Sequence, residues 1–91
     1  MTYEQFTNAD KKGIVMVSDW FNSFLGEIDA KYFPNVKYYR DDENDTKVHY
    51  AAELFNNGVI TYATFVKRLA KACNDTHENI HSILFKYISS Y

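Results

Sequence analysis

Residues 61–88 read TYATFVKRLAKACNDTHENIHSILFKYI, and this stretch decides the fold. Its apolar residues recur at three- and four-residue steps, the spacing that gathers side chains on one face of an α-helix. Thr61 can cap a first helix over residues 62–73, whose apolar face comprises Phe65, Val66, Leu69, Ala72 and Cys73. A second stripe reaches the C-terminus through Ile80, Ile83, Leu84, Tyr87 and Ile88. Asn74 should end the first helix, and Asp75 with Glu78 resembles a capping box at the start of the second.

The first half of the chain carries the longest helical pattern. Its apolar residues are Ile14, Val17, Phe21, Phe24, Leu25 and Ile28, with Trp20 beside them. We expect a helix over residues 8–30, begun by Thr7 and Asp10 in a capping-box-like pair. Pro34 disfavours helical backbone at the residue before it, so this helix should be over by Tyr32.

The segment over residues 34–56 allows two interpretations. Val48, Ala51, Ala52 and Phe55 repeat with helical spacing, which favours a helix over residues 46–56, capped by Asp45 and ended by Asn57 and Gly58. Together the helices predict an all-α fold, a small four-helix bundle-like domain over residues 1–91. The alternative is an α+β fold with a short hairpin at residues 36–51, because residues 36–40 are β-prone and a dense run of turn formers follows them.

Length and composition restrict the class of protein. A chain of 91 residues forms one domain, and 46% apolar residues are ample for its core. Cys73 is the only cysteine, so no intrachain disulfide can form and a cytoplasmic protein is expected. The longest apolar run, residues 14–17, is far shorter than the roughly 20 residues that cross a bilayer, so we expect no membrane association.

Catalytic and metal-binding patterns are weak. Cys73, His77 and His81 are spaced for zinc only on a continuous helix, which the turn at residues 74–76 should break, and no fourth ligand is evident. Cys73 lies on the predicted core face, where thiols are inert, and the glycines form no phosphate-binding loop. The sequence therefore predicts no catalytic site, no cofactor and no metal.

The two C-terminal helices and their turn resemble a DNA-binding helix-turn-helix over residues 66–85. Leu69, Ala70, Ile80 and Ile83 stand where that family has apolar or small residues, whereas Asp75 departs from its pattern. The resemblance implies a transcriptional regulator whose second helix reads the major groove. Its nucleic-acid contacts would come from Lys67, Arg68, Lys71, His77, Asn79 and His81. With few cations near that helix, this is the alternative rather than the main prediction.

The favoured interface is an acidic, aromatic segment before the second predicted helix. It comprises Tyr38, Tyr39, Arg40, Asp41, Asp42, Glu43 and Asp45. Tyr and Arg are common interface anchors, and carboxylates steer a basic partner. We expect a non-catalytic protein-binding module that occludes its partner's basic nucleic-acid-binding surface. Small acidic proteins of this composition are typical of stoichiometric inhibitors, including phage-encoded blockers of restriction or CRISPR machinery.

Overall fold

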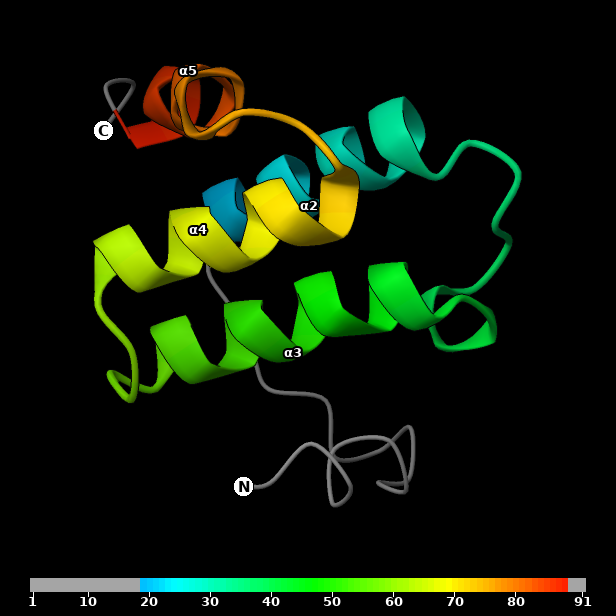
Figure 1. Cartoon of the computed structure of the whole chain (residues 1–91), viewed down its shortest axis with the longest axis horizontal. Helices are drawn as coiled ribbons and strands as arrows, with labels where there is room; N and C mark the ends of the chain where they lie inside the picture. Colours follow the sequence, from blue (N-terminus) through cyan, green and yellow to red (C-terminus); the bar gives the residue numbers. More distant parts are fainter. Residues whose placement is uncertain (1–18, 89–91) are drawn as a thin grey trace.

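The computed structural model describes residues 19–88 of the chain (Figure 1). This part contains four α-helices and one short 3-10 helix, joined by loops. The elements are α2 (Asp19–Tyr32), η2 (Tyr39–Asp41), α3 (Glu43–Asn56), α4 (Tyr62–Cys73) and α5 (His77–Ile88). No strand occurs within residues 19–88, so the all-α prediction is confirmed and the hairpin at residues 36–51 is wrong. The predicted helix start at Asn8 and its cap at Thr7 and Asp10 lie outside the described residues.

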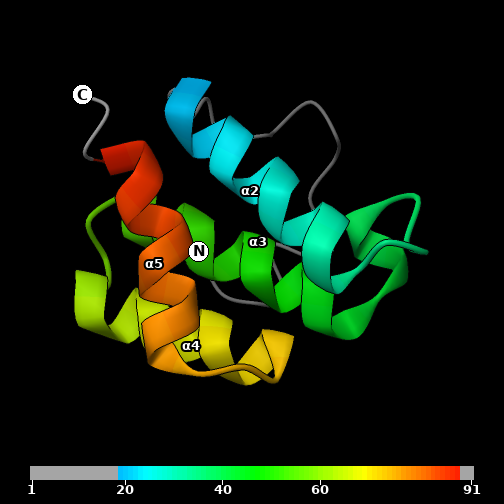
Figure 2. The ribbon, with the colours of Figure 1, turned by 90° about the horizontal axis from the view of Figure 1, so that it is seen from above.

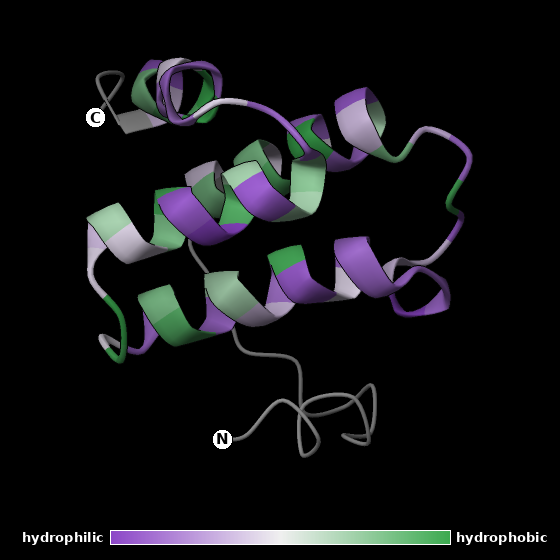
Figure 3. Ribbon diagram, in the orientation of Figure 1, coloured by the Kyte–Doolittle hydropathy of each residue, from purple (hydrophilic) through white to green (hydrophobic). Residues whose placement is uncertain are grey.

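Two of the helices, α3 and α4, run side by side, α2 runs obliquely to them, and α5 crosses over α4. In Figure 1, α2, α3 and α4 extend across the view, whereas α5 is seen end-on. Figure 2, seen from above, shows α5 passing over α4. The packed pairs include α3 with α4, α4 with α5, and α2 with α5. Hydrophobic and hydrophilic segments alternate along each ribbon in Figure 3, as amphipathic helices around a shared core require.

The core forms where the apolar faces of all four helices meet. Leu69, Ile80, Ile83 and Leu84 are buried together, as the helical spacing predicted. Trp20, which we expected in the same cluster, is half-buried and packs against its edge with its ring stacked on Phe21. The layer between α2 and α4 is aromatic, and its largest fully buried side chains are Phe24 and Phe65.

The ends of α4 agree with the sequence prediction, but the start of α5 does not. Thr61 caps α4 by accepting a hydrogen bond from Thr64 N at 3.2 Å. Asn74 ends α4 in the left-handed conformation, with φ 55°. The cap of α5 is Thr76, whose hydroxyl accepts from Asn79 N at 3.1 Å, so Asp75 as a cap is wrong. Asp75 instead accepts a 2.6 Å hydrogen bond from the Tyr32 hydroxyl of α2.

α3 begins earlier than predicted, at Glu43 rather than Thr46. Its cap is Asp42, whose carboxylate accepts from Asp45 N at 3.1 Å, so the assignment of Asp45 as the cap is wrong. Both residues are of the capping type, and local sequence does not discriminate between them. The extra turn carries Asp45 into the interior, where it is 2% exposed.

Replacing Asp42 with Ala should lower the free energy of unfolding by about 0.5–2 kcal/mol, the usual cost of losing a side-chain cap. The adjacent variant Asp41→Ala is the control, because Asp41 is exposed and caps no helix. Urea unfolding followed by circular dichroism measures both. Equal losses in the two variants would contradict the assignment of Asp42 as the cap.

Candidate binding site between α3 and α4

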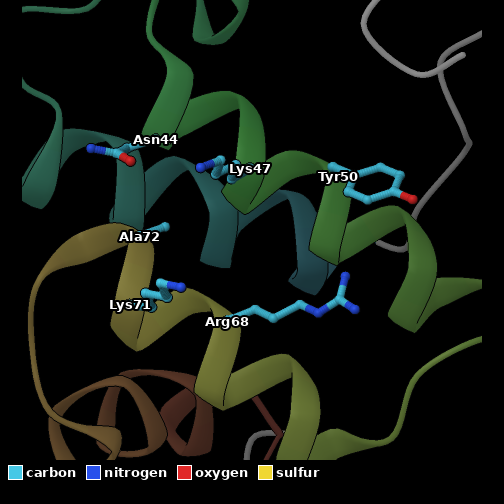
Figure 4. Close-up of a pocket in the computed structure, with 6 residues that line it drawn as sticks. All are labelled: Asn44, Lys47, Tyr50, Arg68, Lys71 and Ala72. Carbon is cyan, nitrogen blue, oxygen red and sulfur yellow. The ribbon is translucent and has the colours of Figure 1, made fainter. Parts of the chain in front are cut away.

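A groove of about 380 Å³ lies between α3 and α4 (Figure 4). We call it the α3–α4 groove, and its lining residues are Asn44, Lys47, Tyr50, Arg68, Lys71 and Ala72. The first three come from α3 and the last three from α4. Figure 4 shows these side chains arriving from the two facing helices.

Helical periodicity explains why these residues meet. On α4, Arg68 and Lys71 are three residues apart and so share one face, while Phe65 and Leu69 turn into the core. On α3, Asn44, Lys47 and Tyr50 follow the same three-residue step. The apolar faces bring the two helices together, and their polar edges are left to form the groove.

The groove is electropositive. Among the described residues 19–88, its lining includes the cations of Lys47, Arg68 and Lys71 and no carboxylate. An acidic side chain stands at its edge, because Lys47 Nζ lies 3.3 Å from Glu43 Oε1 and both side chains are largely exposed. An exposed pair of this kind contributes little to stability, so Lys47 can exchange its partner at little cost. The groove therefore suits an anionic ligand group.

The structure divides the predicted partner-binding segment into three sets. Asp41 and Glu43 are exposed, as an interface requires. Asp42 and Asp45 have the structural positions described above, a helix cap and a buried side chain. Tyr38, Tyr39 and Arg40 are half-buried. The carboxylates that remain available at the surface are therefore Asp41 and Glu43 rather than the whole segment, and Glu43 stands beside Lys47 of the groove.

The residues of the helix-turn-helix alternative are also separated. Arg68 and Lys71 line the α3–α4 groove, and Lys67 and His77 are exposed. The Asn79 amide donates to Asp75 Oδ1 at 2.6 Å, and His81 Nδ1 lies 2.5 Å from the Tyr62 hydroxyl. Lys86, the one cation in the sequence of α5, lies 2.9 Å from Glu27 Oε2. Of the polar side chains of α5, His81 and Lys86 thus contact neighbouring helices, Asn79 contacts the preceding turn, and His77 stays exposed.

A polar cluster joins α2 to α3 at another place. His49 Nε2 lies 3.0 Å from Asp29 Oδ2 and 3.5 Å from Asp45 Oδ1. Burial and the neighbouring Asp29 raise the pKa of Asp45 to about 8. Burial is the largest single influence on Asp29 and acts to raise its pKa, but the hydrogen bonds with His49 and Asp45 and the charge of His49 together outweigh it, so the pKa is lowered. Sequence reasoning missed the cluster, because only the four-residue spacing of Asp45 and His49 is visible along the chain.

Cys73, His77 and His81, whose spacing would suit zinc only on a continuous helix, are not brought together. Cys73 is buried, whereas His77 and His81 are exposed on the far side of the helix break at Asn74. Burial raises the pKa of the Cys73 thiol to about 12, which keeps the sulfur protonated and unreactive at neutral pH.

Among the helices of residues 19–88, none combines the length and apolar character needed to cross a membrane. The chain matches no protein-family model, and neither a curated protein nor a solved structure is significantly similar to it.

Proposed function

We propose that the protein is a non-catalytic protein-binding module whose α3–α4 groove receives an acidic segment of a partner protein. The observation that carries the proposal is the convergence of Lys47, Arg68 and Lys71 on one groove that also contains Tyr50. Arg and Tyr are enriched in protein interfaces, and a guanidinium binds a carboxylate through two parallel hydrogen bonds. A protein of this kind acts by occupying its partner's surface, in keeping with the occluding function expected from the sequence.

The acidic border of the groove favours a protein partner over a nucleic acid. Glu43, beside Lys47, would repel a phosphate backbone laid along this face. A protein surface can present charges of both signs and so match the groove and its border together. The proposal keeps the class of function expected from the sequence, but it moves the main contact from the acidic segment to the groove, so the partner's contacting segment is acidic rather than basic as the sequence predicted. The narrower hypothesis, a phage-encoded inhibitor of nucleic-acid machinery, concerns the partner and stays a prediction.

DNA binding is the second candidate function. In its favour, a three-residue turn at residues 74–76 joins α4 to α5, and α5 crosses α4, as the two helices of a helix-turn-helix do (Figure 2). Against it, α5 offers no cation other than Lys86 for the phosphates that provide most of the affinity for DNA.

Serine at Arg68 and Lys71 should weaken binding of a glutamate-rich peptide about 2- to 30-fold, because two exposed ion pairs at roughly 0.2–1 kcal/mol each are lost. The matched control carries serine at Asp41 and Glu43 and should bind this peptide as well as the parent protein or better. Asp42 and Asp45 are left intact, because the first caps α3 and the second is buried. Amide shifts in NMR titrations would locate the peptide and give the dissociation constants.

The same titrations with a DNA duplex at two salt concentrations separate the two candidate functions. We expect no DNA binding at physiological salt. Tight DNA binding that falls steeply as salt rises, together with no peptide binding, would replace the proposed function with DNA binding. A further titration uses a basic peptide. If the parent protein and the groove variant bind this peptide and the control variant does not, the acidic segment is the interface.

A further inference from the structure

The cluster of Asp29, Asp45 and His49 has the geometry of a metal site. Each residue offers one ligand atom, and these atoms all lie within 4.8 Å of one another. His49 Nε2 is 3.0 Å from Asp29 Oδ2 and 3.5 Å from Asp45 Oδ1. Around a tetrahedral zinc ion with bonds of about 2.0–2.1 Å, ligand atoms stand about 3.3–3.4 Å apart. His49 Nε2 therefore already stands at nearly the required distance from each carboxylate, and the two carboxylate oxygens lie within 4.8 Å of each other.

A buried oxygen in the cluster lacks the partner it needs. Asp45 Oδ1 is buried and accepts no hydrogen bond, although Asp45 is only 2% exposed. The same atom faces His49 Nε2. A buried acceptor without a partner destabilises the folded state, and a second carboxylate nearby adds electrostatic repulsion. A divalent cation held between these three groups would take the place of the proton that Asp45 otherwise keeps, contact the buried oxygen directly and neutralise both carboxylates.

Neighbouring groups hold the histidine in place. The Tyr39 ring stacks on the His49 imidazole, with centroids 4.1 Å apart and an interplanar angle of 14°. Thr46 Oγ1 donates to the Tyr39 carbonyl oxygen at 2.7 Å and so fastens η2 to α3. Supporting contacts of this kind orient a metal ligand before the ion binds. The side chain of Asp29 is 33% exposed, which leaves a solvent-facing position for a water molecule as fourth ligand.

From this geometry we propose that Asp29, Asp45 and His49 bind one divalent transition-metal ion of the zinc class. Imidazole with carboxylate oxygens suits zinc, whereas calcium and magnesium prefer ligand sets made entirely of oxygen. The ion joins α2 to α3, because Asp29 and His49 are twenty positions apart in the chain. It therefore stabilises the fold. Its binding does not depend on the ligand that the α3–α4 groove binds. No stretch of sequence displays the site, because Asp29 reaches it only through the packing of α2.

Zinc added to protein treated with a chelator should bind at one equivalent per chain and raise the melting temperature, because an ion that binds only the folded state stabilises it. Magnesium and calcium should cause no shift. His49→Gln and Asp29→Asn should each weaken zinc binding at least tenfold, as measured by calorimetry. His77→Gln is the matched control, because His77 is an exposed histidine on α5, and it should leave zinc binding unchanged.

Cobalt provides a measurement that does not depend on the stability of the variants. Cobalt bound to the parent protein should show ligand-field absorption without a thiolate charge-transfer band, because all three ligands are oxygen or nitrogen. A thiolate band would place the metal on Cys73 and overturn the proposal. So would the absence of zinc uptake by the parent protein at micromolar zinc, or a loss of zinc binding in His77→Gln that His49→Gln does not share.

Discussion

Phe65→Ala should lower the free energy of unfolding by about 3–5 kcal/mol, the range expected when a fully buried phenylalanine is truncated. Phe65 is 0% exposed. Its ring stacks on Phe55 with centroids 4.7 Å apart and meets the edge of Phe21 at 5.8 Å. Removing it leaves a cavity lined by aromatic rings from α2 and α3, which cannot collapse without moving both helices.

The control for this variant is Phe85→Ala, because Phe85 lies on α5 and is 55% exposed. A substitution at such a surface position should change the free energy of unfolding by no more than about 0.5 kcal/mol. Urea titrations with a common m-value give both numbers. Similar losses in the two variants would mean that the aromatic layer does not form the centre of the core.

Chelator-treated protein should become less stable as the pH rises from about 4 to 8. The pKa of Asp45 is raised to about 8 by burial and by Asp29, against about 3.9 in an unfolded chain. Across this window the folded state keeps a proton that the unfolded state releases, so raising the pH favours unfolding. The lowered pKa of Asp29 has the opposite sign, but its contribution to stability is lost only below about pH 4.

Asp45→Asn should flatten this pH dependence and make the protein more stable than the parent at pH 8, by on the order of a few kcal/mol. The control is Glu43→Gln, which removes an exposed carboxylate from the same helix and should keep the parent slope. Chemical unfolding at a series of pH values measures the three slopes. An unchanged slope in Asp45→Asn would show that this carboxyl group does not carry the pH dependence.

The amino-acid sequence by itself determined the helices that depend on local rules. α4 has the predicted bounds because its apolar residues repeat every three or four positions, Thr61 caps one end, and Asn74 accepts a left-handed conformation at the other. Pro34 likewise limited α2, which ends at Tyr32. These determinants act over a single helical turn, so they can be recognised without knowing what the helix packs against.

Only the tertiary structure decided the start of α3 and the composition of both candidate sites. Asp42 and Asp45 are equally good caps in isolation, and the folded protein uses the first because the second then reaches Asp29 and His49 in the interior. The α3–α4 groove joins Lys47 to Arg68 and Lys71, which the sequence had placed in an alternative DNA-binding surface. The physical reason is the same in both cases: periodicity shows which face of a helix is polar, whereas packing of the apolar faces determines which polar groups meet.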